Sequence, residues 1–418
     1  MKGVPHSYTM SPNPDPLSPI SACSPGTLPA RTDVLIIGGG LLGCAAAYYL
    51  SLAGVPVTLI EQGELSLQAS SQNAGSLHFQ MEYRMIEAGL QASARALQAM
   101  PLHVDAIARW RALEDQLGVS VGVRQKGGFM LAETAQQAQV LEQKSRLENQ
   151  AGLQVQLLDR HALQAKAPYL SDSVLMGAFC ADEGKADPRR ASLALAAAAR
   201  ALGARIVSQC RVVDLRRVGS DWQAEVAGGA QCRSTQVLIA AGVWSGRIAQ
   251  MTGAQLPVTP IALTMTATAR TAPFMDYLFQ HVGRRLSLKQ TAEGTVLIGG
   301  GWPSKLHHRH GIADLERKPS ICLDSLQRSV QTACSVVPHL ATLPVLRAWT
   351  GVTALVADQL PLLGQVPHRP GLFIATGGAA FTLGLTYAHL LVERMLGQPP
   401  SLDISAYDPD RFRSLTFA

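Results

Sequence analysis

The residues in this chain whose types and spacing best suit chemistry are three glycines and a carboxylate. Gly38, Gly40 and Gly43 stand in the pattern G-x-G-x-x-G after a β-rich run, and Glu61 directly follows a second β-rich run. This spacing is the dinucleotide-binding fingerprint of a βαβ unit, in which the glycines permit a tight turn, close approach of a pyrophosphate and close packing of helix on strand. The helix N-terminus would offer N–H groups to the phosphates, and Glu61 could accept hydrogen bonds from a ribose.

The same stretch allows other interpretations. Residues 34–60 carry no charged side chain, and a run of this length can span a bilayer as a helix. Glycines and Pro56 interrupt the run, however, and its β-branched residues gather at its two ends, which favours two strands flanking a helix. Two alternatives stay open at this point: a unit of this fold that binds no nucleotide, and a nucleotide that is NAD.

The composition is that of a globular, well-packed protein. The chain has 418 residues, of which 47% are hydrophobic and 16% charged, and its length suggests roughly two or three domains. The net charge of +6 is spread out, without a basic run interleaved with aromatics, which argues against nucleic-acid binding. The seven cysteines include no C-x-x-C pair, and no apolar segment follows Lys2. We therefore expect reduced thiols, a cytoplasmic location and no integral membrane segment.

A loop and two polar side chains follow the first unit. The run of small polar residues at 69–76 suits a loop against a cofactor, although an ordinary surface loop is the alternative. His78 and Gln80 are two residues apart, so they would share one face of an extended segment and could face a substrate pocket.

Two further features lie in the second half of the chain. A strand–glycine–helix unit at 371–396 would aim a second helix N-terminus at a ligand. His307, His308 and His310 are possible metal ligands, but no carboxylate or cysteine stands at helical spacing from them. We expect a solvated loop there and no metal site.

Taken in order, these motifs resemble the family of FAD-dependent glycine oxidases, sarcosine oxidases and D-amino-acid dehydrogenases. Besides the first unit, the similarity rests on five motifs: A-S-S-Q-N-A-G at 69–75, D-P before a helix at 187–188, A-A-G-V-W-S at 240–245, W-T-G before D-Q-L-P-L-L-G at 349–364, and A-T-G-G at 375–378. The resemblance covers nearly all of residues 31–400 and implies FAD as the dinucleotide. A finer similarity, at 281–290 and 299–303, is to the FAD subunit of heteromeric opine or D-hydroxyproline dehydrogenases.

The resemblance implies an α/β fold with two domains. One would be an interrupted, Rossmann-like FAD-binding domain, and the other an α+β substrate domain with a mixed, mostly antiparallel sheet. The FAD-binding domain would take residues 31–80, 160–250 and 345–418, and the substrate domain 85–155 and 250–345. Residues 1–30 are rich in proline and offer little apolar surface, so we expect a disordered extension there.

The resemblance also implies which residues bind the cofactor. The glycines of the first turn would hold the pyrophosphate, and the later glycine turns would abut the flavin. The full set is Gly38, Gly40, Leu42, Gly43, Glu61, Gln62, Ser70, Ser71, Asn73, Ala74, Gly75, Val212, Ala241, Gly242, Trp244, Gly377, Gly378, Ala379 and Thr382.

The substrate-binding positions depart from the family's pattern. Members similar to glycine oxidase carry an arginine two residues after the W-x-G glycine to hold a carboxylate, and this chain has Thr353 there. A second arginine, after the C-terminal glycine turn, corresponds to Ala380 or Phe381. Threonine cannot form the bidentate pair that arginine makes with a carboxylate. The nearest cationic candidates are Arg284, Arg285 and Lys289.

The activity implied is oxidation of the C–N bond of an amino acid or secondary amine. Hydride would pass from the α-carbon to flavin N5, and the resulting imine would hydrolyse. We expect His78, Gln80, Lys289, Trp302 and Thr353 near this small-molecule substrate, with a lysine as a possible aid to oxygen reactivity. The alternatives are a non-catalytic or assembly subunit active only with heteromeric partner subunits, and an NAD-dependent enzyme.

Overall fold

The computed structural model describes residues 21–22, 27–87, 89 and 95–413. The stretch from Arg31 to Ile60 folds as the strand β2 (Arg31–Ile37), the helix α1 (Leu41–Leu52) and the strand β3 (Val57–Ile60), and β2 pairs in parallel with β3. The membrane-helix interpretation of this stretch is therefore wrong. No helix within the described residues is both long and apolar enough to cross a bilayer.

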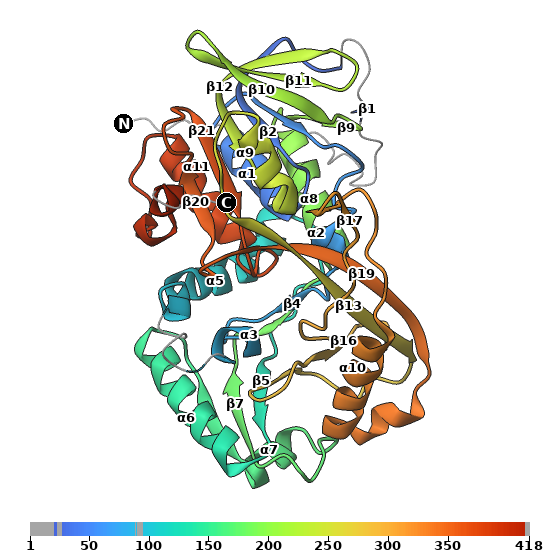
Figure 1. Cartoon of the computed structure of the whole chain (residues 1–418). Helices are drawn as coiled ribbons and strands as arrows, with labels where there is room; N and C mark the ends of the chain where they lie inside the picture. Colours follow the sequence, from blue (N-terminus) through green and yellow to red (C-terminus); the bar gives the residue numbers. More distant parts are fainter. Residues whose placement is uncertain (1–20, 23–26, 88, 90–94, 414–418) are drawn as a thin grey trace, which may run out of the picture.

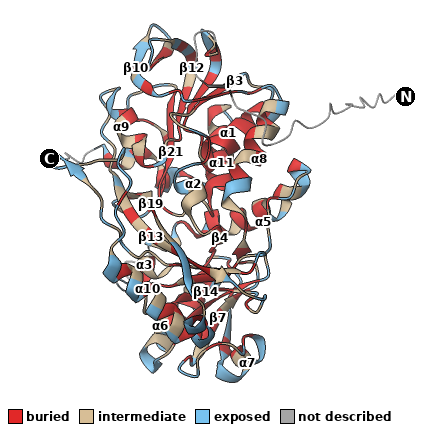
Figure 2. Ribbon diagram, turned by 90° about the vertical axis from the view of Figure 1, so that its right-hand side faces the viewer, coloured by how far each residue is buried: buried red, intermediate tan, exposed pale blue. Residues whose placement is uncertain are grey.

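The first large sheet surrounds this unit. Within the described residues it has nine strands, in the order β1-β9-β3-β2-β12-β11-β10, and it branches where β12 pairs with β21 beside β20. The added strands are β1 (Ser21–Ala22), β9 (Arg205–Ser208), β10 (Val212–Val218), β11 (Asp221–Val226), β12 (Gln231–Ile239), β20 (Leu362–Gln365) and β21 (Leu372–Thr376). Alanine-rich α1 packs between α8 (Pro188–Ala201) and α11 (Gly384–Met395), and α11 also contacts α5 (Met100–Leu117). These helices share one buried apolar cluster (Figure 2).

The second large sheet forms the other half of the molecule (Figure 1). Within the described residues it has eight strands, in the order β19-β13-β16-β15-β14-β5-β7-β6, and only the β14–β5 pair is parallel. The mixed, mostly antiparallel sheet is thus confirmed. Its strands are β5 (Gly128–Ala132), β6 (Gln156–Asp159), β7 (Met176–Cys180), β13 (Val258–Arg270), β14 (Leu278–His281), β15 (Ser287–Gln290), β16 (Thr295–Gly299) and β19 (Val345–Val356). The helices α6 (Ala135–Gln150), α7 (Arg160–Lys166) and α10 (Leu323–Val336) accompany it.

Short elements connect the two halves. The helix α2 (Ala69–Gln72) contacts both α8 and β19, and β4 (Ser76–Leu77) pairs with β8 (Gly184–Lys185). The helix α3 (Tyr83–Ile86) follows β4, and a 3₁₀ turn (Gly242–Trp244) leads from β12 into α9 (Ser245–Gln250). A two-stranded hairpin, β17 (His308–Arg309) and β18 (Ile312–Ala313), holds part of the histidine-rich loop.

The strands divide the chain at other points than the expected domain boundaries. The expected FAD-binding segments begin at 160 and 345, yet β7 and β19 both belong to the second sheet. In the expected disordered extension, Ser21–Ala22 pairs with β9 and Leu28 is buried, so these residues are part of the fold. Residues 1–20 and 23–26 lie outside the described part of the chain.

Candidate active site

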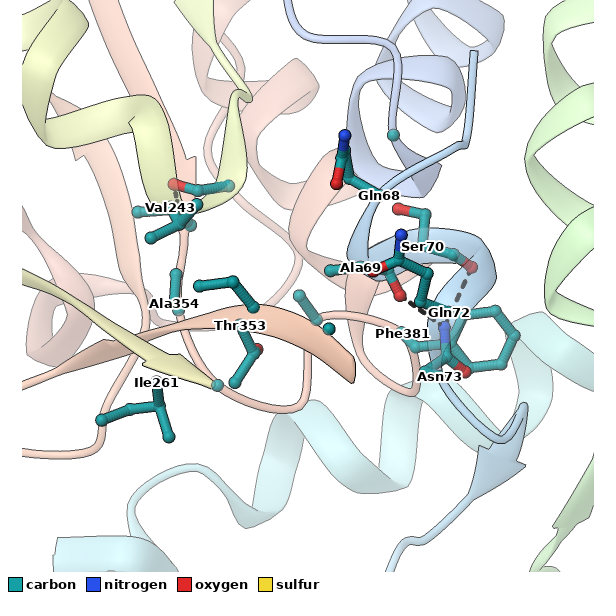
Figure 3. A pocket seen from close by; sticks show the side chains of 18 of the residues that line it. Gln68, Ala69, Ser70, Gln72, Asn73, Val243, Ile261, Thr353, Ala354 and Phe381 are labelled. Carbon is teal, nitrogen blue, oxygen red and sulfur yellow. Dashed lines mark hydrogen bonds between the residues drawn. The ribbon is translucent and has the colours of Figure 1, made fainter. Parts of the chain in front are cut away.

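A cavity of about 730 Å³ lies between the two large sheets. Its first end is lined by the turn after β2 and the segments that follow β12 and β21, and its second end by residues of β13, β15 and β19. Figure 3 shows Gln68, Ala69, Ser70, Gln72 and Asn73 on one wall and Thr353, Ala354 and Ile261 on another. The volume is within the range of about 300–1,000 Å³ typical of sites for small molecules and cofactors.

The three fingerprint glycines are required by close contacts, with backbone at Gly38 and Gly43 and with a side chain at Gly40. Gly38 has φ +118°, and a Cβ there would lie 2.4 Å from the Ala240 carbonyl oxygen. A Cβ on Gly43 would lie 2.0 Å from the Gly38 oxygen, so Gly43 sets how closely α1 packs on the turn and does not line the cavity. A Cβ on Gly40 would approach Ser70 Oγ to 2.8 Å. At Gly38 and Gly40 the turn therefore presents bare backbone to the cavity.

Two side chains brace this turn. The Ser70 hydroxyl accepts a hydrogen bond of 2.9 Å from the backbone N–H of Leu41, at the N-terminus of α1. The Glu61 carboxylate accepts one bond from the Gly39 N–H (2.7 Å) and one from the Gly63 N–H (2.9 Å). Ser70 and Glu61 also line the cavity, as do Leu42 and Gln62. Polar atoms and unpaired helix N–H groups thus surround this end.

The loop at 69–75 is held by its own asparagine. The Asn73 amide donates to the Ala69 and Ser70 carbonyls (2.9 Å each), and its oxygen accepts from the Gly75 N–H (2.6 Å). Asn73 and Ala74 line the cavity, whereas Ser71 and Gly75 do not. A Cβ on Gly75, which has φ +70°, would lie 2.2 Å from the Ala186 oxygen.

The remaining expected cofactor residues come together at the cavity wall from three distant segments. Val212, Ala241, Gly242, Trp244, Gly377, Gly378, Ala379 and Thr382 all line it. Two bonds fix the C-terminal turn, because Tyr387 donates its hydroxyl to the Gly378 carbonyl (3.1 Å) and Thr382 donates to that of Ser76 (3.3 Å). The indole N–H of Trp244 is buried and has no partner among the described residues.

The expected substrate contacts do not all reach the cavity. His78 and Thr353 line it, but Gln80, Lys289 and Trp302 do not. Gln80 is fully buried and accepts a hydrogen bond from Lys144 Nζ (3.2 Å), because the chain leaves the extended conformation soon after Leu77. The cavity contacts Gly301 and Pro303 on either side of Trp302.

His78 and Lys289 are buried basic groups with perturbed proton affinity. His78 Nε2 lies 2.8 Å from Ser287 Oγ, and burial lowers the pKa of His78 to about 4. Burial, helped by the charge of Lys185, lowers the pKa of Lys289 to about 7. The Lys289 ammonium makes no hydrogen bond or ion pair with any residue that the structure describes, and the bare backbone of Gly75 faces it.

Sequence reasoning missed three charged residues of the second end. Arg84 lies 3.3 Å from Glu82, and Arg285, which was a candidate, lies 3.6 Å from Glu87. All four line the cavity. Arg84 Nη2 would be 3.3 Å from a Cβ on Gly378, so its guanidinium lies against the C-terminal turn, near which this chain lacks the arginine of the family pattern. Nothing in the sequence signals this, because Arg84 comes from a distant segment.

A second correction concerns Arg284, which faces away from the cavity. Its guanidinium pairs with Glu133, and Glu133 also lies 3.2 Å from His281 Nε2. The hydrogen bond with His281 lowers the pKa of Glu133 to about 2. Burial opposes this shift, and the Ser173 hydroxyl and the Arg284 charge add to it. Arg284 thus pairs with Glu133 and does not line the cavity.

Buried carboxylates support the segment that carries His78 and Glu82. Glu183 accepts hydrogen bonds from the N–H groups of Phe79 (2.9 Å) and Gln80 (3.0 Å), and Glu148 accepts one from that of Met81 (2.6 Å). Lys144 pairs with Glu148 at 2.7 Å, fully buried. Burial raises the pKa of Glu183 to about 7. Three successive backbone groups are therefore anchored directly beside the cavity-lining side chains.

No group of three potential metal-ligating side chains gathers anywhere in the described part of the chain. In the histidine-rich loop, His307 Nε2 lies 3.0 Å from the Ser320 hydroxyl, and His308 belongs to the short exposed hairpin.

Comparison with known proteins gives a family and several relatives. The family profile DAO, described as FAD dependent oxidoreductase, matches residues 33–394. A glycine oxidase from Geobacillus kaustophilus is 27% identical over 360 residues, covering 83% of this chain and 88% of that protein. A subunit of the opine oxidase from Rhizobium meliloti is 26% identical over 394 residues, covering 91% and 98%. The mitochondrial dimethylglycine dehydrogenase of Mus musculus is 26% identical over 420 residues, but the chain spans only 46% of that protein.

The solved structure of the Geobacillus kaustophilus glycine oxidase has the same fold. It matches with a TM-score of 0.78 at 23% sequence identity, over 91% of this chain and 98% of that one.

Proposed function

Because the chain belongs to the family of FAD-dependent oxidoreductases, we propose that it oxidises the C–N bond of an amino acid or secondary amine in the cavity between its two sheets. The observation that carries this proposal is the construction of that cavity. One end offers glycine turns and backbone groups suited to a dinucleotide, and the other offers paired charged side chains suited to an amino acid.

The cavity fits FAD. Gly38 and Gly40 line the cavity at the N-terminus of α1, where the pyrophosphate would lie. Glu61 would bind the ribose. The buried indole N–H of Trp244 has no acceptor among the described residues, so it could donate a hydrogen bond to the cofactor. The Gly377–Ala379 turn and the Ser70–Ala74 loop would contact the flavin. Gly43, Ser71 and Gly75 would act indirectly, by letting these segments pack closely.

When bound, FAD supplies a two-electron acceptor for hydride from the substrate α-carbon. The chain itself must hold the substrate and exclude water. Arg84 and Arg285 are suited to hold carboxylates, since an arginine–carboxylate pair is directional and strong. Arg84 lies beside the Gly377–Ala379 turn, so a carboxylate bound there would place the adjacent α-carbon close to the flavin. Thr353, uncharged, would contribute a hydroxyl contact.

The position of Lys289 is relevant to which electron acceptor the enzyme uses. A buried lysine that carries no partner among the described residues and faces the loop at Gly75 would present a proton and positive charge near the flavin. Such a group favours reduction of oxygen to peroxide, so we propose that the enzyme can react with oxygen. The alternative to an oxidase is a dehydrogenase, which passes its electrons to an acceptor other than oxygen.

The experiment is an anaerobic substrate panel on the purified holoprotein. Glycine, N-methylglycine, D-proline and iminodiacetate are each added to the yellow protein, and bleaching of the visible absorbance of the oxidised flavin is followed at about 450 nm. Bleaching by any of these amines supports the proposal. Admission of air then reports peroxide and tests the role of Lys289. A colourless protein, or one that none of the amines bleaches at any pH, would contradict it.

The second candidate is a subunit that works only in a heteromeric complex. The observation in its favour is the similarity to an opine oxidase subunit along nearly the whole length of that protein. Measuring the mass of the protein in solution, alone and after co-expression with the products of neighbouring genes, distinguishes the two. If bleaching appears only in the complex, the assembly is the enzyme.

The proposed location is the cytoplasm. Cys44, Cys180 and Cys232 are buried as free thiols, a state that a reducing compartment maintains. Fractionation of cells that express the tagged protein tests this.

A further inference from the structure

Amine oxidation by hydride loss requires a neutral amine, and none of the contacts described above removes a proton from the substrate nitrogen. The nitrogen lone pair must be free to support loss of hydride from the α-carbon, but the ammonium group of a free amino acid or of a secondary amine has a pKa well above neutral pH. The substrate therefore arrives protonated at neutral pH, and a group in the cavity must take that proton. This reasoning rests on the proposed function.

The cavity offers several carboxylates, and most are already engaged. Glu61 holds the backbone of the first turn through both of its oxygens. Glu316 pairs with Arg211 at 3.6 Å, beside Val212 at the nucleotide end. Glu87 lies by Arg285. Glu82 is the carboxylate beside Arg84, and although it precedes α3 it does not cap that helix.

Three groups face the Glu82 carboxylate: Arg84 of α3, His78 after β4 and His103 of α5. Both histidines are buried, and burial lowers the pKa of each to about 4, so both are neutral at neutral pH. Their Nδ1 atoms are buried without a partner among the described residues. Arg84 is thus the one permanent cation among these three neighbours. Burial, the largest single effect, raises the pKa of Glu82, but the Arg84 charge and hydrogen bond together with His78 and His103 bring that pKa below its ordinary value.

Substrate binding would change this balance. A substrate carboxylate on Arg84 would compete with Glu82 for the guanidinium, and so would remove the interaction that favours the ionised form of Glu82. At the same moment the substrate ammonium would enter the space next to Glu82. The Glu82 side chain is 30% exposed in the free protein. When substrate displaces the water around it, a neutral acid beside a neutral amine becomes favoured over two separate charges.

We propose that Glu82 binds the substrate ammonium and takes one of its protons, so that the amine becomes neutral in place. The N–H bond breaks, an O–H bond forms on the carboxyl, and the electron pair stays on nitrogen. Glu82 is then a catalytic residue that contacts the reacting nitrogen, while His78 and His103 provide an uncharged wall around its carboxyl group.

The test is the pH dependence of flavin reduction in the Glu82→Gln holoprotein, measured by anaerobic stopped flow with the panel amine that reduces the flavin fastest. Only the neutral amine would react with this variant. Below the pKa of the amine, its rate constant at low substrate should therefore fall about tenfold per pH unit, and should recover at high pH. The wild-type profile should stay flatter down to a lower pH. Glu82→Asp keeps the acid and should restore the wild-type shape.

Two controls separate a catalytic from a structural effect. Glu87→Gln removes the other substrate-end carboxylate and should leave the shape of the pH profile unchanged. Methoxyacetate, an ether analogue of N-methylglycine without an ionisable nitrogen, should bind Glu82→Gln within about twofold of wild type, as judged by perturbation of the flavin spectrum. Equal pH profiles in wild type and Glu82→Gln would overturn the role of Glu82 while leaving the proposed function intact. A flavin that no amine bleaches at any pH would overturn both.

Discussion

The two ends of the cavity are built in opposite ways. At the nucleotide end the lining includes two glycine turns, and the first of them, which runs from Gly38 into α1, is one continuous segment. At the substrate end the lining includes two arginines, Arg84 and Arg285, which come from segments far apart in the sequence. The first end depends on glycines that let backbone segments approach closely, and the second depends on the positions of a few long, charged side chains.

This difference determines how each end tolerates change. A Cβ on Gly38 or Gly43 meets backbone that cannot move away, so the damage spreads to the fold. A changed arginine at the substrate end alters which molecule binds, while the sheets on either side remain. Stability should therefore respond mainly to the first end, and substrate choice mainly to the second.

Gly43→Ala should have the largest effect. The new Cβ would lie 2.0 Å from the Gly38 oxygen, so α1 must move off β2, at a cost of about 3 kcal/mol or more in the free energy of unfolding. Urea unfolding and FAD content measure it. Gly63→Ala is the matched control, because its Cβ would meet only Glu61 Oε1 at 3.9 Å. Equal unfolding midpoints for the two variants would show that the Gly38–Gly43 turn can shift to accommodate a Cβ at position 43.

Arg84→Met should act on substrate and leave FAD in place. Loss of a charge-assisted pair with a substrate carboxylate costs about 2–5 kcal/mol, so KM should rise about 30-fold or more. Flavin content should match wild type. Arg347→Met, on the exposed part of β19, is the control and should leave KM unchanged. A variant that loses FAD but retains its KM once reloaded would place Arg84 with the nucleotide end.

Lys289→Met should change how stability depends on pH. The pKa of Lys289 is about 7 when folded and about 10.5 when unfolded, so between these values the unfolded chain binds more protons. Stability from this group therefore rises with pH, by about 2 kcal/mol from pH 7 to pH 9. The variant should lack this rise in urea unfolding of the FAD-free protein. Exposed Lys318→Met should retain it, and an unchanged slope in Lys289→Met would show that Lys289 is charged when buried.

The same contrast explains what the sequence could predict. The βαβ unit from Arg31 to Ile60 was predictable because its signals are local: strands of β-branched residues, glycines at fixed spacing and a breaking proline. The start of α8 is equally local, since Asp187 caps the helix by accepting from the Arg189 N–H (2.9 Å) and Pro188 occupies its first turn.

The substrate end has no such local signal. Gln80 was placed beside His78 by the period of an extended strand, but β4 ends at Leu77, and Gln80 turns into the buried network with Lys144. Arg84 and Glu82 stand out by neither motif nor spacing, because their role depends on contact with Gly378 and His103 across the folded chain. Only the tertiary arrangement identifies them.

Thr353→Val should have the smallest effect, and it tests whether a neutral position at the substrate end contributes at all. The change keeps the side-chain shape and removes one hydroxyl from the cavity wall, so KM should rise about 2- to 10-fold if that hydroxyl contacts substrate. Thr350→Val on the same strand is the matched control. Its hydroxyl donates to the Pro319 carbonyl (2.9 Å), so its loss should lower the unfolding midpoint and leave KM alone. An unchanged KM in Thr353→Val would mean that charged side chains alone select the substrate.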